Sequence, residues 1–314
     1  MPERLHIFAG SGSTKLTAAI CRELGIEQAS GETLKFSDGN LFVRVLENVR
    51  DRRVFIVQGT CYPTNDNFLE LLFWIDAFRR ASARAVTAVI PFFSYAKGDK
   101  KDEPRVSIRA RVCADALETA GVDRVVTMDL HAPQVQGFFR VPVDHLYALP
   151  VICEYVTQLG LDDLVVASPD EGFARMARKY AHVLKAGVAV GDKYRGAHDE
   201  RAEVKGMLGN VEGKTVLIVD DFALSCGSLV AMAQVVLDNG ARQVYAAASH
   251  GLLSEGSTEK IEAGPIKQLI ITDTIENRSV PLTPKVKVIS AAPLFAEAIR
   301  RIHQHESVSA LFPV

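Results

Sequence analysis

The chain has 314 residues, which is too long for one ordinary hydrophobic core and fits two domains of about 150 residues each. Hydrophobic residues make up 48% and charged residues 24%, an ordinary globular composition. The formal net charge of −2 gives no reason to expect binding to nucleic acid or to an anionic membrane, so any bound anion must be met by local groups.

The first residues run directly into a short strand-like segment, without a charged leader followed by a long apolar region. No uninterrupted apolar run approaches the ~18 residues that a membrane helix needs. The five cysteines are scattered, odd in number and never spaced C-x-x-C, which favours neither a disulfide framework nor a zinc site. We therefore expect a protein of the reducing cytoplasm.

Short β-branched runs alternate with longer amphipathic stretches along the whole chain. In the first half, strands are predicted at 54–58, 86–90 and 125–128, and an apolar helix at about 69–78 follows a loop rich in turn residues. The second half repeats this pattern, with strands predicted at 164–167, 188–190, 216–219, 244–248 and 269–272. The alternation is typical of βαβ units and predicts an α/β fold of two similar domains, each a largely parallel sheet flanked by helices.

A domain boundary is predicted near Leu149-Pro150, where a proline precedes a new helix. We assign residues 1–149 to an N-terminal domain and residues 150–291 to a C-terminal domain. The final residues, 292–314, are assigned to the N-terminal domain.

Polar residues follow strand after strand at its carboxyl end. They are Asp129 and His131, Ser168 and Asp170, Asp220 and Asp221, and Ser249 and His250. In open α/β sheets, ligands bind at the carboxyl ends of the strands, where helix N-termini also point. A purely structural sheet also tolerates polar residues there, but four such clusters in two similar halves favour an active cleft.

Two glycine-rich segments imitate nucleotide-binding motifs. Gly10-Ser11-Gly12 lacks the third glycine of a dinucleotide fingerprint, because position 15 is lysine, and it is interpreted as a tight strand-to-helix turn. The segment 209–215 has one spacer residue too few for a P-loop and precedes its strand instead of following one. Neither segment supports the usual mononucleotide or dinucleotide folds.

The segment 216–228 carries the strongest chemical signal. A buried strand delivers Asp220 and Asp221, and a turn of small residues leads into a helix N-terminus. Such a turn offers backbone N–H groups, hydroxyls and the positive helix end to a phosphate monoester. The carboxylates can accept hydrogen bonds from vicinal sugar hydroxyls, so phosphate and diol together indicate ribose 5-phosphate. The alternative is two exposed acids followed by an N-capping serine.

This segment resembles the phosphoribosyl-binding motif shared by phosphoribosyltransferases and ribose-phosphate pyrophosphokinases. Further segments resemble the pyrophosphokinases specifically and run in family order over essentially the whole chain. They are Phe36-Ser37-Asp38-Gly39, Asn65-Asp66-Asn67, Tyr95-Ala96 with Asp99, Asp129-Leu130-His131-Ala132, Gln136-Gly137-Phe138-Phe139, Ser168-Pro169-Asp170, Asp192-Lys193 with Arg195, and Ser307-Val308-Ser309 with Leu311-Phe312.

The resemblance implies a phosphoribosyltransferase-like fold and transfer of the diphosphoryl group of ATP to the C1 hydroxyl of ribose 5-phosphate, giving phosphoribosyl pyrophosphate and AMP. Such a transfer needs charge neutralisation and in-line positioning rather than a covalent nucleophile. Lys193 and Arg195 would be the catalytic residues, closing on the transition state as electrostatic clamps. Mg²⁺ is the implied cofactor, with His131 and Asp170 holding the ion or its water shell.

The resemblance also implies the binding residues. Phe36 would stack on adenine and Asp38 would recognise its edge, in a loop that reaches a neighbouring subunit's site. The implied ATP-binding residues are Phe36, Asp38, Asn40, Lys97, Asp99, Lys100 and His131. Those implied for ribose 5-phosphate are Asp220, Asp221, Ser225, Cys226, Gly227 and Ser228. The family forms homo-oligomers based on dimers, often stacked into hexamers.

Several positions depart from the most familiar family pattern. Leu224 stands where an acid is usual, Asn40 where a glutamate is common, Lys97 where arginine is usual, and Gly98 where glutamine is usual. Tyr194 replaces the middle of three basic residues. Two alternatives therefore stay open: a non-catalytic regulatory paralogue and a phosphoribosyltransferase. The retained acids and basic residues favour a divergent active enzyme.

Overall fold

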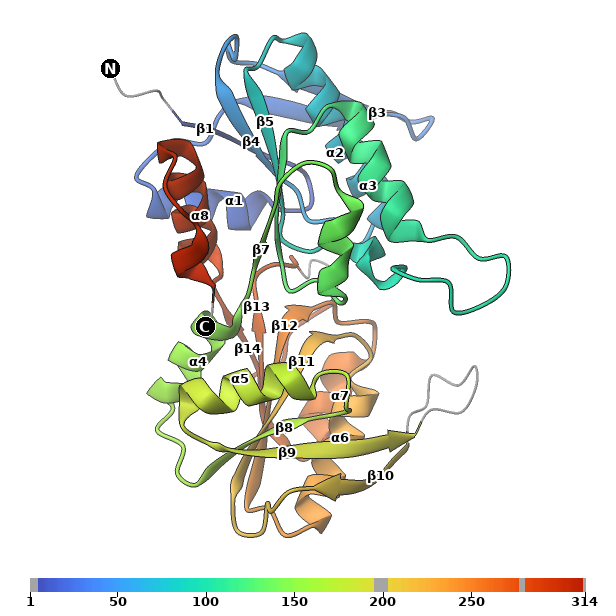
Figure 1. Cartoon of the computed structure of the whole chain (residues 1–314), viewed down its shortest axis with the longest axis vertical. Coiled ribbons are helices and arrows are strands. Elements are labelled where there is room, and N and C mark those ends of the chain that lie inside the picture. The colour runs from blue at the N-terminus through green and yellow to red at the C-terminus, as the bar shows by residue number, and fades with distance from the viewer. Residues whose placement is uncertain (1–4, 195–202, 277–279, 313–314) are drawn as a thin grey trace.

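The computed structural model describes residues 5–194, 203–276 and 280–312, and it has two lobes stacked along the long axis of the molecule (Figure 1). Each lobe is built around its own sheet, and helices flank the sheets. The predicted α/β fold of two largely parallel sheets is confirmed.

The first lobe contains a five-stranded sheet in the order β1-β4-β5-β6-β7, in which every neighbouring pair is parallel. Its strands are β1 (His6–Ala9), β4 (Arg53–Val57), β5 (Ala85–Ile90), β6 (Arg124–Met128) and β7 (Val143–Leu146). Its helices are α1 (Thr14–Glu23), α2 (Thr64–Arg80) and α3 (Arg109–Ala120), with the 3₁₀ turns η1 (Ser94–Lys97) and η2 (Pro133–Phe138). The β-branched runs form these strands because both faces of a parallel sheet are buried.

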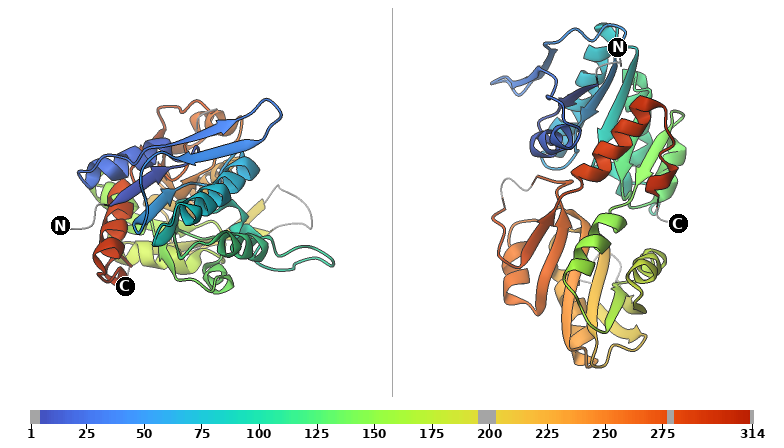
Figure 2. Two further views of the ribbon diagram at one scale, coloured as in Figure 1. Left: turned by 90° about the horizontal axis from the view of Figure 1, so that it is seen from above. Right: turned by 90° about the vertical axis from the view of Figure 1, so that its left-hand side faces the viewer.

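A separate antiparallel hairpin of β2 (Gly31–Lys35) and β3 (Leu41–Val45) projects from this lobe (Figure 2). The hairpin is not hydrogen-bonded to the main sheet, and β3 packs on α2. Sequence reasoning did not predict it.

The second lobe contains a seven-stranded sheet in the order β10-β9-β8-β11-β12-β13-β14. Its strands are β8 (Leu164–Ser168), β9 (Gly187–Tyr194), β10 (Glu203–Leu208), β11 (Thr215–Ala223), β12 (Gln243–Gly251), β13 (Ile266–Thr272) and β14 (Val286–Ile289). Its helices are α4 (Leu149–Gln158), α5 (Ala174–Leu184), α6 (Gly227–Asp238) and α7 (Ser257–Ala263). Only the β9–β10 pair of this sheet is antiparallel among the described residues.

The last helix, α8 (Ala292–Gln304), returns to the first lobe and packs against α1 (Figure 2). Arg53 of β4 contacts the ring of His305 just beyond this helix, and the 3₁₀ turn η3 (Ser309–Leu311) follows. Phe295 and Ile299 of α8 belong to a buried cluster that also includes strand residues of both sheets, such as Val126 and Val219. The two lobes therefore share part of one hydrophobic core.

Three local predictions need correction. Residues 64–67 were expected in a loop, but they form the first turn of α2, where Asp66 lies near the positive helix end. Strand β11 continues through Asp220 and Asp221 to Ala223, because β12 pairs with it along this extra length. Strand β9 continues to Tyr194, because β10 pairs with it. None of the described helices is both long and apolar enough to span a membrane.

Candidate functional site

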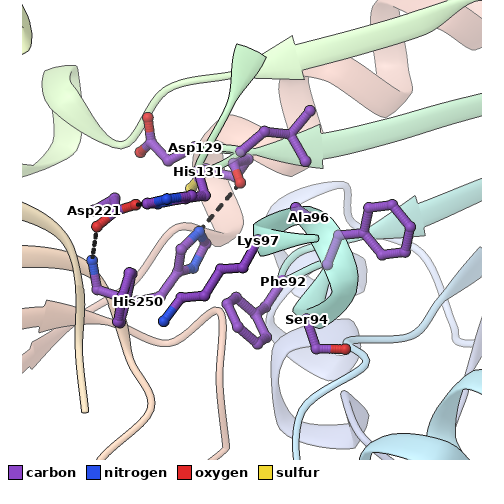
Figure 3. A pocket seen from close by; sticks show the side chains of 12 residues that line it. Phe92, Ser94, Ala96, Lys97, Asp129, His131, Asp221 and His250 are labelled. Atoms are coloured by element: carbon purple, nitrogen blue, oxygen red, sulfur yellow. Dashed lines mark hydrogen bonds and ion pairs between the residues drawn. The ribbon is translucent and has the colours of Figure 1, made fainter. Parts of the chain in front are cut away.

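A cleft lies between the two lobes, at the carboxyl ends of their central strands (Figure 3). The first lobe contributes segments that follow β5 and β6, and the second lobe contributes β11 and β12. The lining residues are Phe92, Phe93, Ser94, Ala96, Lys97, Met128, Asp129, Leu130, His131, Asp221, Phe222 and His250. Three of the four polar clusters predicted at strand ends therefore contribute to this cleft.

His250 forms the floor of the cleft and joins the lobes. Its Nε2 lies 3.1 Å from the carbonyl oxygen of Met128, and its Nδ1 lies 2.8 Å from the hydroxyl of Thr274. Burial lowers the pKa of His250 to about 4, so the ring is neutral near pH 7. With a neutral ring, Nε2–H donates to the Met128 carbonyl and Nδ1 accepts from Thr274.

Asp129 is a second link between the lobes. Its carboxylate accepts hydrogen bonds from the Ser249 hydroxyl at 2.5 Å and from the Ala148 N–H at 2.8 Å. Burial raises the pKa of Asp129 to about 6, although both hydrogen bonds oppose the shift. Its backbone has a positive φ of 36°, which turns the chain sharply toward His131.

His131 and Asp221 meet across the cleft, with Nδ1 2.6 Å from the Asp221 carboxylate. This hydrogen bond raises the pKa of His131 above its usual value. Burial of Asp221 acts to raise its pKa, but the bond and charge of His131 outweigh it and hold the pKa below the usual range. Both shifts favour an imidazolium paired with a carboxylate, with Asp221 as the charged acceptor in the cleft.

Asp220 lies beside this pair in a different electrostatic environment. Burial, together with the neighbouring charge of Asp221, raises the pKa of Asp220 well above its usual value. The charge of Asp170, in the segment after β8, adds to this effect, so Asp170 lies near the same strand end. Three carboxyl groups thus gather where positive charge or sugar hydroxyls would relieve their repulsion.

The turn after β11 leads directly into α6. Cys226 is the N-cap residue, with a positive φ of 57°, and the helix begins at Gly227. The first N–H groups of a helix have no partner within it and carry partial positive charge. Ser225 and Ser228 flank this helix start, so the predicted arrangement of hydroxyls and a helix N-terminus is present. The thiol of Cys226 is buried, and this burial raises its pKa to about 11.

On the opposite wall, Lys97 lies over the aromatic ring of Phe222, with Nζ 3.2 Å from the ring centroid. The hydrogen bond with Asp221 has the largest effect on the pKa of His131. The charges of Lys97 and Asp99 also affect this pKa, so both residues lie near the imidazole ring. Sequence reasoning missed Phe222, although it directly follows the acidic pair that was singled out. The signal that could have identified Phe222 is its aromatic side chain, placed near the end of the strand that carries the predicted binding acids.

Other predicted residues lie elsewhere. Phe36, Asp38 and Asn40 lie at the tip of the β2–β3 hairpin, exposed and outside the cleft lining. Lys100 lies in an exposed segment after η1. The Asp38 carboxylate accepts hydrogen bonds from the backbone and side-chain amides of Asn40, which lower the pKa of Asp38.

Of the two basic residues predicted for catalysis, Lys193 belongs to β9. Lys193 was expected in a loop, but its backbone is part of β9 and pairs with Val204. Arg195 lies outside the described residues.

No three His, Cys, Asp or Glu side chains within the described ranges gather closely enough to form a complete metal site. The carboxyl groups of Asp170, Asp220 and Asp221 still provide the oxygen ligands that a hard divalent cation prefers. Such a cation usually keeps several waters and is held partly by substrate phosphates, so an incomplete protein ligand set fits it.

Comparison with known proteins gives consistent results over the whole chain. The family model described as the N-terminal domain of ribose phosphate pyrophosphokinase matches residues 5–121, and that of the phosphoribosyl synthetase-associated domain matches residues 200–313. A ribose-phosphate pyrophosphokinase of Caldanaerobacter subterraneus subsp. tengcongensis is 48% identical over 309 residues, covering 98% of both chains. A ribose-phosphate pyrophosphokinase of Clostridium tetani is 44% identical over 311 residues, covering 98% of this chain and 97% of its own.

Among solved structures, the phosphoribosylpyrophosphate synthetase from Mycobacterium smegmatis superimposes with a TM-score of 0.89 at 35% sequence identity. The match covers 96% of this chain and 100% of that protein.

Proposed function

The chain belongs to the ribose-phosphate pyrophosphokinase family, and we propose that the cleft between its lobes is where it makes phosphoribosyl pyrophosphate and AMP from ribose 5-phosphate and ATP. In this reaction the C1 hydroxyl oxygen bonds to the β-phosphorus, the bond from that phosphorus to AMP breaks, and the hydroxyl proton is released. The observation that carries the assignment to the cleft is Asp221 on β11, which contacts His131, lines the cleft together with Lys97, and lies on the strand that leads into the N-terminus of α6.

Ribose 5-phosphate would bind along the end of β11 and the start of α6. Asp221 is charged and Asp220 lies next to it, so the two can accept hydrogen bonds from vicinal ribose hydroxyls. The 5-phosphate would accept hydrogen bonds from the N–H groups of Gly227 and Ser228 and from the hydroxyl of Ser225. Cys226 would contribute its backbone, because its thiol is buried. The loss of an acid at Leu224 leaves this backbone cradle intact.

ATP would lie on the first-lobe side of the cleft, near Lys97, Asp99, Lys100 and His131. The ammonium group of Lys97 provides positive charge close to the ribose site. Phe36, Asp38 and Asn40 would hold adenine in the cleft of a neighbouring subunit, since they are exposed and lie outside the lining of the cleft in their own chain. The proposal therefore includes a homo-oligomer based on dimers, with hexamers as a further assembly.

Mg²⁺ is the proposed cofactor, held by Asp170 and, directly or through its water shell, by His131. When bound, the ion would neutralise charge on the phosphates of ATP. Lys193 and Arg195, at and beyond the end of β9, would stabilise the charge that develops on the transferred group. None of these roles needs a covalent nucleophile.

The proposed domains are residues 1–149 with 292–314, and residues 150–291. The return of α8 to α1 and the position of α4 at Leu149 support this division. We also propose a cytoplasmic location and no nucleic-acid or membrane partner, on the basis of the net charge of −2 and the family's small-molecule chemistry.

The test is AMP formation by the full chain with Mg²⁺ present and phosphate added. We expect AMP from ATP only when ribose 5-phosphate is also present, together with a product that releases pyrophosphate when a phosphoribosyltransferase and its base are added. Absence of AMP at millimolar substrates would contradict the proposal and favour a regulatory subunit without catalysis.

A further inference from the structure

Glu70 of α2 is a buried carboxyl group that takes no part in the cleft. Its side chain is 2% exposed, and it accepts hydrogen bonds from five donor groups. The donors are the N–H and hydroxyl of Ser11 at 3.0 and 3.1 Å, the hydroxyl of Thr33 at 2.7 Å, the amide of Gln58 at 3.2 Å and the indole N–H of Trp74 at 3.2 Å. In every contact a carboxyl oxygen of Glu70 is the acceptor.

The donors come from parts of the lobe that are otherwise separate. Ser11 lies in the turn after β1, Gln58 follows β4, Trp74 lies on α2 itself, and Thr33 lies in the middle of hairpin strand β2. All the donors are uncharged, so neutral hydrogen bonds compensate for the burial of this carboxylate. Through Glu70, the hairpin is hydrogen-bonded to the body of the lobe.

Apart from this hydrogen bond, the hairpin is held by the packing of β3 on α2 and against the core of the lobe, and by contacts of β2. Its two strands pair only with each other among the described residues. At its base, Gly31 approaches the Trp74 ring so closely that an added Cβ would lie 2.5 Å from it. Farther out, Lys35 forms an ion pair with Asp66 at 2.5 Å, but both side chains are exposed and such pairs contribute little. The Thr33–Glu70 bond is a partly buried polar contact between these two points.

We infer that Glu70 is a positioning residue for the nucleotide: its hydrogen bond to Thr33 sets the direction in which the hairpin carries Phe36, Asp38 and Asn40. The inference rests on the proposed role of this tip in holding adenine. From Thr33 to Phe36 the strand extends roughly 10 Å, so a small change of angle at Thr33 displaces the tip by an ångström or more. Displacements of about 1 Å lower the efficiency of a site on the order of 100-fold in unfavourable cases.

The inference is tested with Thr33→Val, which keeps the shape of the side chain and removes only its hydroxyl. Thr33→Ser restores the hydroxyl and serves as the rescue. Ser11→Ala removes a different hydrogen bond to the same carboxylate without touching the hairpin, so it controls for a general loss of stability. Phe36→Ala tests independently whether the tip holds ATP. For each full-length variant, AMP formation is measured over a range of ATP and of ribose 5-phosphate concentrations, together with the thermal unfolding midpoint.

We expect Thr33→Val to raise the KM for ATP roughly fivefold to tenfold, the size of effect that loss of one ordinary hydrogen bond gives. The KM for ribose 5-phosphate should stay within about twofold, as should every kinetic constant of Thr33→Ser and Ser11→Ala. If Phe36→Ala raised the KM for ATP and Thr33→Val left it unchanged, the positioning role of Glu70 would be rejected. The role of the hairpin tip in holding ATP would then still stand. An unchanged KM in Phe36→Ala would reject the ATP role of the hairpin, and the inference with it. Equal increases in both KM values of Thr33→Val would indicate general destabilisation and also reject it.

Discussion

The proposed ribose side and the proposed nucleotide side of the cleft are built in different ways. On the ribose side, the acidic pair and the phosphate turn occupy the single stretch 220–228, at the end of a strand held between β8 and β12. On the nucleotide side, Lys97 and His131 come from separate segments, and the hairpin is hydrogen-bonded through Thr33 to the distant residue Glu70. Local chain geometry fixes the first side, whereas contacts between residues far apart in the sequence fix the second.

This difference explains where substitutions are tolerated. A phosphate cradle made from backbone N–H groups keeps its shape when Leu224 replaces an acid or when serines occupy positions 225 and 228. A nucleotide site made from side chains on several segments is sensitive to each of them and to their supports. We therefore expect binding of ribose 5-phosphate to be the more robust property and affinity for ATP the more variable one.

The largest expected effect is a loss of turnover that leaves substrate binding on both sides of the cleft nearly unchanged. Lys193→Ala should lower the rate of AMP formation about 1000-fold, because loss of a cation that stabilises the transferring group typically costs this much or more. Binding of ribose 5-phosphate, measured by titration calorimetry, should change less than about twofold. Lys267→Ala, an exposed lysine on β13, is the matched control. An unaltered rate in Lys193→Ala would reject its role as a clamp.

The second prediction concerns the contact between the lobes at His250. The pKa of His250 is about 4 in the folded protein, whereas an unfolded histidine has a pKa of about 6.5. Between these values the unfolded chain binds a proton that the folded chain does not. Stability is therefore fully present above pH 6.5 and decreases as the pH falls toward 4, by about 3 kcal/mol for this residue.

His250→Gln keeps a donor for the Met128 carbonyl and should remove this part of the pH dependence, as measured by urea unfolding between pH 4.5 and 7. His145, whose pKa burial also lowers to about 4, contributes a similar decrease in both proteins. His305→Asn, at an exposed position with positive φ, should retain the full slope. If the stability of His250→Gln depended on pH as steeply as that of the parent, the ring would not be buried in its neutral form. That result would contradict the close contact between the lobes at this residue.

The sequence was most informative where structure and chemistry are local. The strands of both sheets were located because parallel strands are buried on both faces and produce continuous β-branched runs. The segment 220–228 was identified because its acids, turn and helix start are adjacent in the chain. The fold class and the family could therefore be predicted from the sequence alone.

Features made by distant residues could not be read in this way. Strand β2 (GETLK) lacks the apolar run that marks a buried strand, and its partner β3 (LFVRV) has such a run but is only half-buried. The donors to Glu70 include groups 59 and 37 positions away, so nothing near it in the sequence indicates its role. The pairing of His131 with Asp221 spans 90 positions and depends on how the lobes meet. Strand β9 was predicted too short, since its extension follows from pairing with β10.

A third prediction sharpens the account of the ribose side. Asp220→Asn keeps an oxygen that can accept from the Asp221 N–H, but it removes a carboxyl group whose pKa burial and the neighbouring charge raise. Because the pKa of Asp220 is higher in the folded than in the unfolded chain, its contribution to stability decreases as the pH rises, so at pH 8 the variant should be more stable to urea than the parent. Its KM for ribose 5-phosphate should rise about 10- to 30-fold, since an amide is a weaker acceptor for sugar hydroxyls. Asp238→Asn, an exposed residue at the end of α6, is the control. Loss of stability in Asp220→Asn would contradict the electrostatic interpretation.

The smallest predicted effect tests whether the two sides are independent. Phe222 follows the acidic pair on β11, yet its ring contacts Lys97 of the nucleotide side. Phe222→Leu keeps apolar volume and removes the aromatic face, so it should raise the KM for ATP about threefold, as expected for loss of a partly exposed cation–π contact. Phe222→Tyr retains that face and should keep the KM for ATP unchanged. If Phe222→Leu instead altered only the KM for ribose 5-phosphate, the ring would belong to the ribose side alone. If Phe222→Leu changed the KM for ATP, the position of the Lys97 ammonium group would depend on a residue of the opposite lobe. The ribose-side segment on β11 would then also orient a charge on the nucleotide side.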